Sequence, residues 1–314
     1  MAYVDLSLVA FLDRFQSEEA CLALIYACRW PHGFVCPYCG HNDEHRISTR
    51  PRNVQCCVCR RQSSITAGTI FEHSKVPLRK WFLAIWLMSQ DKGGISSTRL
   101  AKHIDVHLET AWFMCQKMRL VMGNRDEGLT LAGTIELDEA FFGGKAKSKR
   151  NRKPPSTGKK LALVMVESEG RRAGNVVMKV IPDDGIDSLK QVLSRKVESE
   201  PPGQLIRCDA WGSHHIAMTL GHRVEMQHVP IEMQDELLRC VNLAVSHAKR
   251  MFKGTYHQFC KTHIQRYFDE FCYRWNRRGN DAQLATHLVA ACSLHAPVLC
   301  KLIPAVKPTP QTTA

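Results

Sequence analysis

The spacing of apolar residues predicts a helical first part of the chain, up to about residue 122. Apolar positions recur every three to four residues over 5–30 and again over 78–90, where LRKWFLAIWLMSQ follows Pro77. Between these segments, residues 31–66 are rich in turn-forming residues and dense in Cys, His and Arg. Helical spacing resumes over 96–122. The first part therefore combines helices with one short segment of a different kind.

After GNRDEG at 123–128 the pattern changes to strands. Apolar runs predict five of them: TIELDEAFF, LALVMVES, NVVMKVIP, QLIRCDAW and HRVEMQHVP, at 134–142, 161–168, 175–182, 204–211 and 222–230. A helix over 186–198 separates the third strand from the fourth, and the chain after the fifth strand is mostly helical to about residue 302. The order β-β-β-α-β-β-α indicates a mixed α/β domain, distinct from the first part.

Charge and composition narrow the classes of partner. The 43 Lys and Arg residues outnumber the 30 acids and give a net charge of +13. Such an excess favours a polyanion such as DNA, although a basic surface without that role is the alternative. No apolar run approaches the ~18 residues of a membrane span, and the acidic N-terminus lacks the features of a secretory signal. We therefore expect a cytoplasmic, nucleoid-associated protein with no membrane partner, whose 14 cysteines are reduced.

Four of the cysteines have the spacing of a metal site. Cys36-Pro-Tyr-Cys39 and Cys56-Cys-Val-Cys59 are two C-x2-C pairs with 16 residues between them, which is typical of a zinc ribbon. We expect one structural Zn²⁺ held by Cys36, Cys39, Cys56 and Cys59, and we expect the folding of the segment to depend on it. The weaker alternative ligands are Cys57, His32, His41 and His45.

Residues 94–122 have the pattern of a helix-turn-helix. Ser96 or Ser97 can cap a short helix, Asp105 and Val106 can form the turn, and a longer helix follows. An ordinary helical hairpin is the alternative, but the basic charge and the neighbouring zinc ribbon favour DNA binding. The DNA contacts expected from these two modules are Arg60, Arg61, His107, Thr110 and Lys117.

Two aspartates at strand positions are the candidate catalytic residues. Glu136 and Asp138 share one face of the first predicted strand, and Asp209 follows the apolar residues of the fourth. A carboxylate at sheet level is unfavourable unless a cation or hydrogen bonds satisfy it. Two aspartates delivered to one place predict a site for two Mg²⁺ or Mn²⁺ ions, which can activate water or a 3′-hydroxyl for attack on a phosphodiester.

A third oxygen ligand is expected from the helix predicted over 236–252. Asn242 and Lys249 are seven residues apart and share one helix face, so that Asn242 can bind a metal and Lys249 a phosphate. His247 and Glu236 are the rival ligands. The aromatic pattern of 267–278 predicts a buried helix face. Two further DNA contacts are expected at its basic end, Arg274 and Arg277.

Together these motifs resemble bacterial insertion-sequence transposases of the DDE type, in the ISXO2-like branch with an N-terminal zinc ribbon. The matching stretches are CPYCG with CCVC, TAGTIFEHSKVPLRKWFLAIWLM, ELDEAFFGGK, CDAW, and KGTYHQFCKTHIQRYFDEFCYRWNRR. The resemblance implies a ribonuclease-H-like catalytic domain with a mixed five-stranded sheet and helices. It places the catalytic Asp-Asp-Asn set at Asp138, Asp209 and Asn242, and the basic residue that follows the third position at Lys249.

The pattern and the resemblance predict an N-terminal helical segment (1–30), a zinc ribbon (31–75), a helix-turn-helix region (76–123), the catalytic domain (129–300) and a disordered tail (303–314). We expect a transposase that binds the terminal inverted repeats of an insertion sequence, cuts the ends and joins them to target DNA. A homodimer or larger assembly is expected, because two ends must be held together. The alternatives are a zinc-dependent DNA-binding regulator without catalysis, and a ribonuclease-H-like nuclease.

Overall fold

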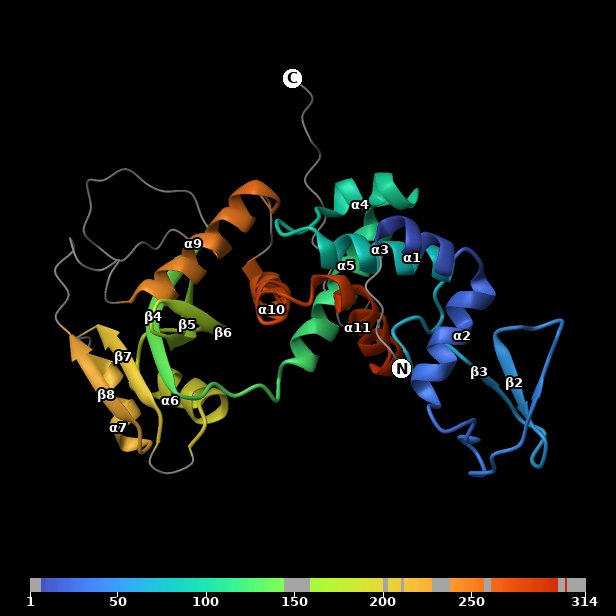
Figure 1. The fold of residues 1–314 in the computed structure, drawn as a ribbon, viewed down its shortest axis with the longest axis horizontal. Helices are drawn as coiled ribbons and strands as arrows, with labels where there is room; N and C mark the ends of the chain where they lie inside the picture. The colour runs from blue at the N-terminus through green and yellow to red at the C-terminus, as the bar shows by residue number, and fades with distance from the viewer. Residues whose placement is uncertain are drawn as a thin grey trace, which may run out of the picture. The chain divides into compact units, whose positions relative to one another are not determined.

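The chain folds into two compact units (Figure 1). The first contains residues 1–122 and 279–314, and the second contains residues 123–278. The boundary at Gly123 is where the hydrophobic pattern changes from helices to strands. The computed structural model describes residues 7–143, 159–199, 203–209, 212–227, 238–256, 261–298 and 303.

The first unit begins with two helices where one helical segment was expected. Ser17 separates them, because its hydroxyl accepts a hydrogen bond from the Ala20 N–H (3.2 Å) and starts a new helix. The helices described for this part of the chain are α1 (Leu8–Arg14), α2 (Glu18–Arg29), α3 (Leu78–Gln90), α4 (Ser97–Ile104), α5 (Leu108–Arg125, which ends in the second unit) and α11 (Asp281–Leu294).

The last helix, α11, belongs to the first unit although the predicted catalytic domain extended to residue 300. It packs against α2 and α3, and the Ile70 N–H donates to the carbonyl of Cys292 (3.4 Å). Its apolar residues Leu284, Leu288 and Val289 are almost fully buried. The sequence predicted a helical segment here, but it did not indicate which core its apolar residues join. Ile303, assigned to the tail, is also buried, and residues 304–314 lie outside the described part.

The segment between α2 and α3 is a small antiparallel sheet in the order β1-β2-β3. Its strands are β1 (Glu44–Arg46), β2 (Asn53–Cys56) and β3 (Gln62–Ser64). Val54 in the central strand is fully buried, but a sheet of this size cannot bury a core sufficient for independent stability. Its stability must therefore come from another source, and the cysteines are the candidates.

Helices α4 and α5 follow the predicted helix-turn-helix pattern. Ser96 caps α4 by accepting a hydrogen bond from the Arg99 N–H (3.2 Å), and Asp105 turns the chain with a left-handed φ of 49°. Lys80 of α3 donates to the carbonyl of Asp105 (2.5 Å), so that α3 supports the turn. Leu100 and Ile104 of α4 are buried, as tight packing of such a pair requires.

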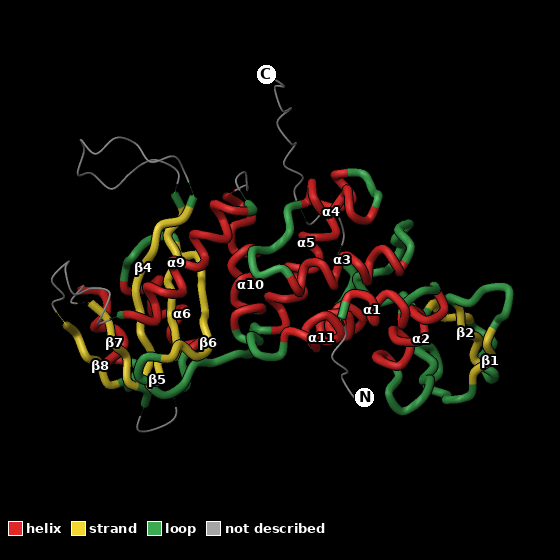
Figure 2. Tube along the Cα trace, turned by 45° about the horizontal axis from the view of Figure 1, so that its top comes forward, coloured by secondary structure: helices red, strands yellow, loops and turns green. Residues whose placement is uncertain are grey.

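The second unit is built on a five-stranded sheet in the order β6-β5-β4-β7-β8 (Figure 2). Strand β4 runs antiparallel to β5 and β5 antiparallel to β6, whereas β7 and β8 run parallel to β4. The strands are β4 (Thr134–Phe142), β5 (Lys160–Glu169), β6 (Arg172–Ile181), β7 (Leu205–Asp209) and β8 (Arg223–Gln227). This is the mixed five-stranded sheet that was expected.

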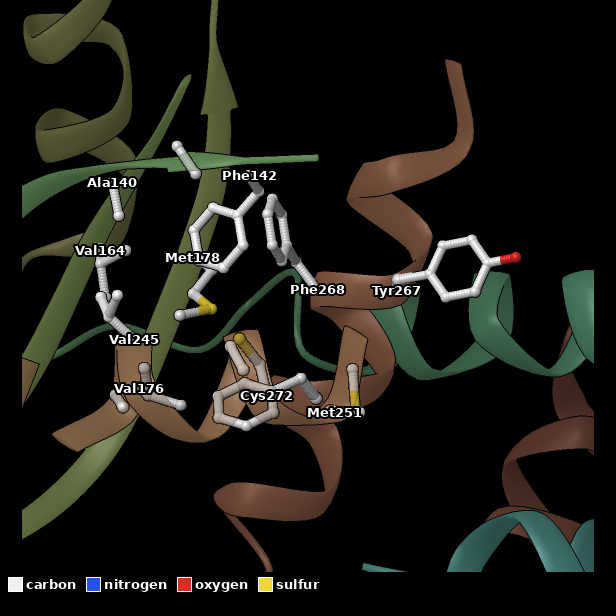
Figure 3. Close-up of a cluster of buried hydrophobic side chains, with 14 of the residues drawn as sticks. Ala140, Phe142, Val164, Val176, Met178, Val245, Met251, Tyr267, Phe268 and Cys272 are labelled. Atoms are coloured by element: carbon white, nitrogen blue, oxygen red, sulfur yellow. The ribbon is translucent and has the colours of Figure 1, made fainter. Parts of the chain in front are cut away.

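Helices cover both faces of this sheet. One face packs against α6 (Ile186–Lys196) and the short α7 (Ile216–Thr219), and the other against α9 (Arg239–Gly254) and α10 (Ile264–Trp275). Alternate residues of β4 serve the two cores: Leu137 lies with α6, whereas Phe142 contacts Phe252 and Phe268 on α9 and α10 (Figure 3). The short 3₁₀ turns η1 (Gly212–His215) and η3 (Lys261–His263) precede α7 and α10. None of the helices described here combines the length and apolar character needed to span a membrane.

Candidate catalytic and zinc-binding sites

The four predicted zinc ligands lie together. The Sγ atoms of Cys36, Cys39, Cys56 and Cys59 all lie within 4.8 Å of one another, and the pairs Cys36–Cys59 and Cys39–Cys56 are 3.6 Å apart. A tetrahedral Zn²⁺ with Zn–S bonds of ~2.3 Å separates its sulfur atoms by roughly 3.8 Å, so the cluster fits one ion. In the described ranges, neither Cys57, which is exposed, nor any histidine belongs to this group.

The turns after Cys36 and Cys56 have the same backbone hydrogen bond. The N–H of Gly40 donates to the carbonyl of Cys36 (2.9 Å), and the N–H of Arg60 donates to that of Cys56 (3.1 Å). Gly40 and Arg60 both have a left-handed φ, 73° and 61°. The backbone N–H of Cys59 lowers the pKa of the Cys56 thiol by stabilising the thiolate, the form that binds zinc.

In the second unit, the register of two parallel strands brings the predicted aspartates side by side. Leu137 of β4 pairs with Cys208 of β7, so the next residues, Asp138 and Asp209, lie at the same height on neighbouring strands. Such strands are ~4.8 Å apart and in-register residues point to the same face. Residues at 138 and 209 therefore project from one face of the sheet, opposite to the buried Leu137 and Cys208.

The electrostatics of the two carboxylates show that a cation would be favourable there. Burial, with the nearby negative charges of Glu139 and Asp209, raises the pKa of Asp138 to about 6. The Oδ1 atom of Asp209 is buried; Nδ1 of His214 lies 3.1 Å from it, but among the described residues no hydrogen bond to this oxygen is formed. A buried carboxylate oxygen without a donor is costly, and oxygen ligands are those that Mg²⁺ and Mn²⁺ prefer. The residues present therefore fit a divalent cation.

A histidine that the sequence pattern did not single out lies beside this pair. His214 in η1 has a side chain only 1% exposed, and its Nε2 lies 3.0 Å from Oε1 of Glu139. Its Nδ1 lies 3.1 Å from Oδ1 of Asp209 and 3.2 Å from the Asp209 carbonyl oxygen. Burial alone would lower the pKa of His214, but interactions with Cys208 and Glu139 raise it to about 11. The sequence contained only a weak indication of this contact: Glu139 is an acid next to Asp138, and His214 is a histidine soon after the fourth predicted strand.

Glu136 shares a face with Asp138, as expected, but it anchors a helix. Its side chain is 3% exposed, and Oε2 accepts hydrogen bonds from the N–H groups of Cys240 (2.6 Å) and Val241 (3.0 Å) in the first turn of α9. The Ser168 hydroxyl donates to Oε1 (2.9 Å). The carboxylate thus satisfies helix N–H groups that lack an intrahelical partner and interacts favourably with the positive end of the helix. Through Glu136, β4 fixes the start of α9.

Glu136→Ala should destabilise the second unit by about 2–4 kcal/mol, because it leaves two buried N–H donors unpaired. Chemical denaturation of the full chain measures the loss, and hydrogen exchange should locate it at the start of α9. Glu136→Gln is the matched control, since its amide oxygen still accepts from α9, and it should lose only about 1 kcal/mol. Equal stability of the parent and the alanine variant would contradict the anchoring role.

Helix α9 carries Asn242 and Lys249 on one flank and His247 on another. At ~100° per residue, Asn242 and Lys249 differ by only about 20°, whereas His247 lies about 140° from Asn242. The Nζ of Lys249 lies 5.8 Å from the ring centroid of Phe142 at the end of β4. The ring of His247 packs edge-on against Trp275 of α10 (5.6 Å), whose Nε1 donates to the carbonyl of Gly174 in β6. Asn242 thus shares the flank of α9 toward β4, which carries Asp138, while His247 faces the β6 side.

The predicted DNA contacts of the first unit are mostly exposed. Arg60 and Arg61 are exposed beside the cysteine cluster, where the Arg61 guanidinium lies 5.0 Å from the Tyr38 ring centroid. His107 at the start of α5 is exposed and Thr110 is half-buried. Lys117 was expected to face a groove, but it is half-buried and its Nζ lies 3.4 Å from the carbonyl of Ile70, so it points toward the protein.

The two DNA contacts predicted near the end of α10 have acidic partners inside the second unit. Arg274 is 9% exposed and lies 3.2 Å from Glu270, one helical turn earlier. Arg277 binds both carboxylate oxygens of Asp126, at 2.6 and 3.1 Å, and its side chain is 25% exposed. Both guanidinium groups therefore stabilise the second unit internally. Glu236, the other rival for the third ligand, lies outside the described part of the chain.

Comparisons with known proteins agree with this architecture. Residues 130–276 match the ISXO2-like transposase domain, and residues 16–62 match the transposase zinc-ribbon domain. An "Uncharacterized protein in transposable element ISH50" of Halobacterium salinarum is 27% identical over 231 residues, which are 73% of this chain and 74% of that protein.

Solved structures give weaker matches. A pre-cleavage Mos1 transpososome matches with a TM-score of 0.28 and 13% identity, over 71% of this chain and 81% of that chain. An intasome of simian T-cell lymphotropic virus matches with a TM-score of 0.28 and 12% identity, over 55% of this chain and 63% of that chain. The chain therefore spans less than two thirds of the intasome chain, and matches at these TM-scores add nothing to the domain matches.

The mixed five-stranded sheet and the segment with four clustered cysteines correspond to the two matched domains of a transposase with an N-terminal zinc ribbon. The two transposase domain matches together cover more than half of the residues. The chain belongs to the ISXO2-like transposase family with an N-terminal zinc ribbon.

Proposed function

We propose that this chain binds the terminal inverted repeats of an insertion sequence, cuts the DNA at its ends and joins the resulting 3′-hydroxyls to target DNA. The observation that carries the proposal is the register of β4 and β7, which brings Asp138 and Asp209 to the same height on one sheet face. Water and then a DNA hydroxyl are the nucleophiles, so no side chain needs to form a bond with the DNA.

The donor set supports two Mg²⁺ or Mn²⁺ ions. Asp138, Asp209 and Asn242 offer only oxygen atoms as ligands, which suits these cations. When bound, such ions supply activation of the nucleophile and neutralisation of the leaving oxygen. Asp138 and Asp209 hold them from the sheet, and Asn242 adds its amide oxygen from α9. Lys249, exposed seven residues later, pairs with a phosphate of the DNA backbone.

Asn242→Ala should reduce cleavage of end DNA by at least about 100-fold, whereas His247→Ala should stay within about threefold of the parent. The reason is that Asn242 shares the flank of α9 with Lys249, which lies by Phe142 of β4, whereas His247 lies on the flank that packs against Trp275. His247→Ala is the matched control, because it alters the same helix and removes only a ring contact with Trp275. The opposite ranking of the two variants would make His247 the third ligand.

The zinc ribbon and the helix-turn-helix pair are the DNA-binding modules in this proposal. The net charge of +13 supports a DNA partner, and exposed Arg60, Arg61 and His107 are available for phosphate contacts. Since two ends must be joined to one target, we propose that the chain works as a dimer or larger assembly. Light scattering on end DNA should therefore give a mass above that of one protomer; a single protomer throughout the reaction would contradict this.

Arg60→Gly separates DNA binding from stability. The left-handed φ of Arg60 costs roughly 1 kcal/mol that glycine avoids, so the variant should stabilise the zinc ribbon by about that amount. It should also weaken DNA binding. The slope of log affinity against log salt concentration should become shallower by about one, the effect of losing one phosphate contact. Denaturation and a salt titration of DNA affinity measure the two effects. Arg61→Gly should weaken binding without the gain in stability, and unchanged DNA affinity in both variants would exclude this contact.

The direct test of the proposed function uses labelled DNA containing the element ends, with a target plasmid and Mg²⁺ or Mn²⁺. The parent protein should nick the ends and join them to the target, and both activities should require the metal. Cutting without joining would favour a nuclease. DNA binding without cutting, with no difference between the parent and Asp209→Ala, would favour a regulator.

A further inference from the structure

The sequence ELDE at 136–139 contains three acids, and the structure gives each one different partners. Glu136 holds the start of α9, and Asp138 faces the candidate cation site. Glu139 points to the opposite face of β4, its side chain is 13% exposed, and its Oε1 lies 3.0 Å from Nε2 of His214. The proposed cleavage reaction does not use Glu139 or His214.

The imidazole of His214 connects β4 with the end of β7. One ring nitrogen faces Glu139, and the other lies between two oxygens of Asp209, 3.2 Å from the carbonyl and 3.1 Å from Oδ1. The ring is almost completely buried, and both of its nitrogens have an oxygen within 3.2 Å. A buried ring with an acceptor at each nitrogen is a rigid connection between two strands.

The side chain of Asp209 is less constrained by its own strand than that of Asp138. Asp209 is the last residue of β7, and its side chain is 43% exposed. Asp138 lies within β4, and its Oδ1 accepts a hydrogen bond from the Glu139 N–H (2.8 Å). The negative charge of Asp138 on the neighbouring strand also repels the Asp209 carboxylate until a cation binds. Without a support, Asp209 would turn toward solvent.

We propose that Glu139 and His214 act as positioning residues, which hold the carboxylate of Asp209 in the orientation that binds the catalytic cation together with Asp138. This inference rests on the proposed function, because it concerns the same cation site. Glu139 fixes the ring of His214, and His214 fixes both the backbone and the side chain of Asp209. Groups that orient metal ligands in this way typically contribute about 10–100-fold to metal affinity or activity.

The test compares the full-length parent with His214→Gln, Glu139→Gln and the double variant. His215→Gln is the matched control, because it makes the same change at the next residue, which is exposed. Three quantities are measured: Mn²⁺ affinity without DNA, the Mn²⁺ concentration that gives half-maximal cleavage of end DNA, and Tm. The affinity measurement does not depend on activity.

We expect His214→Gln to raise two midpoints by about 10–100-fold: that of Mn²⁺ binding without DNA, and the Mn²⁺ concentration that gives half-maximal cleavage. At saturating Mn²⁺, cleavage should return to within a few-fold of the parent. Glu139→Gln should shift both midpoints in the same direction by a smaller factor, and the double variant should be no worse than His214→Gln, because the two residues act in series. His215→Gln should match the parent in all three measurements.

Unchanged Mn²⁺ midpoints in His214→Gln and Glu139→Gln would overturn the inference, even if Tm fell, because the pair would then be structural only. If His214→Gln does not fold, Glu139→Gln decides the question in the same way. Failure of the proposed function would give a different result. The parent would neither bind Mn²⁺ nor cleave DNA, or Asp209→Ala would cleave DNA as well as the parent. Either result would exclude the cation site and therefore this inference.

Discussion

Asp138→Ala should reduce cleavage of end DNA by at least about 1000-fold, equivalent to roughly 4 kcal/mol of transition-state stabilisation, while DNA affinity stays within about threefold of the parent. Asp138 is the innermost oxygen ligand of the proposed site and lies within a strand, so no neighbouring side chain can take its place. The proposed DNA-binding modules belong to the other unit and should be unaffected. Cleavage rates and DNA titrations at one fixed salt concentration provide the two numbers.

The stability of an Asp138 variant separates loss of a ligand from unfolding. The folded protein raises the pKa of this carboxyl to about 6, so folding favours its protonated form. The ionised group therefore destabilises metal-free protein above about pH 6, and the effect fades as the pH falls through about 6 toward the ordinary pKa near 4. Asp138→Asn, which keeps the side-chain volume, should raise Tm at about pH 8 and leave it unchanged below about pH 4. An inactive Asp138→Asn protein with a lowered Tm at alkaline pH would contradict this account of the site.

Removal of zinc should unfold the segment around residues 31–66 and abolish specific binding of the element ends, a loss of at least about 100-fold. The small sheet β1-β2-β3 has little apolar core, and the binding energy of a zinc site with four cysteine ligands, on the order of 10–16 kcal/mol, is its main source of stability. Hydrogen exchange with a zinc-selective chelator, in the presence of Mg²⁺, should show rapid exchange in this segment and continued protection of β4, β5 and β6.

Two cysteine variants provide the matched comparison for the zinc prediction. Cys39→Ser should lose the ion and reproduce the effect of the chelator, because it removes one of four ligands. Cys57→Ser should keep one zinc per chain and normal DNA binding, because Cys57 is exposed and outside the cluster. Stoichiometric zinc in Cys39→Ser, or loss of zinc in Cys57→Ser, would show that the ligand set is wrong.

Local sequence patterns predicted the positions of the helices and strands better than they predicted which of these elements pack together. The five strands lie within a few residues of the predicted ranges, because alternation and β-branched runs are local signals. The cysteine ligands were equally predictable, since their spacing alone determines which thiolates can meet. Strand order has no local signal, so the pairing of β4 with β7 was not predicted. The acids at two strand positions led to the expectation that Asp138 and Asp209 meet, and the register of the two strands brings them to the same height.

The sequence did not indicate the partners of residues whose roles depend on tertiary contacts. Arg274 ends a basic stretch, but Glu270 one turn earlier pairs with it inside the unit, and Arg277 pairs with Asp126 from a distant segment. The roles of Glu136 and His214 likewise depend on α9 and on the turn after β7, which sequence spacing does not reveal. A helix was expected in the region of α11, but its place in the first unit was not.

The central claim is that Asp138 and Asp209 bind the same divalent cation. Crystals of the full-length protein grown with Mn²⁺ and measured at the manganese absorption edge test it most directly. The account predicts an anomalous peak within about 2.2 Å of one carboxylate oxygen from each aspartate. Ordered carboxylates turned away from each other, with no peak between them at saturating Mn²⁺, would contradict it.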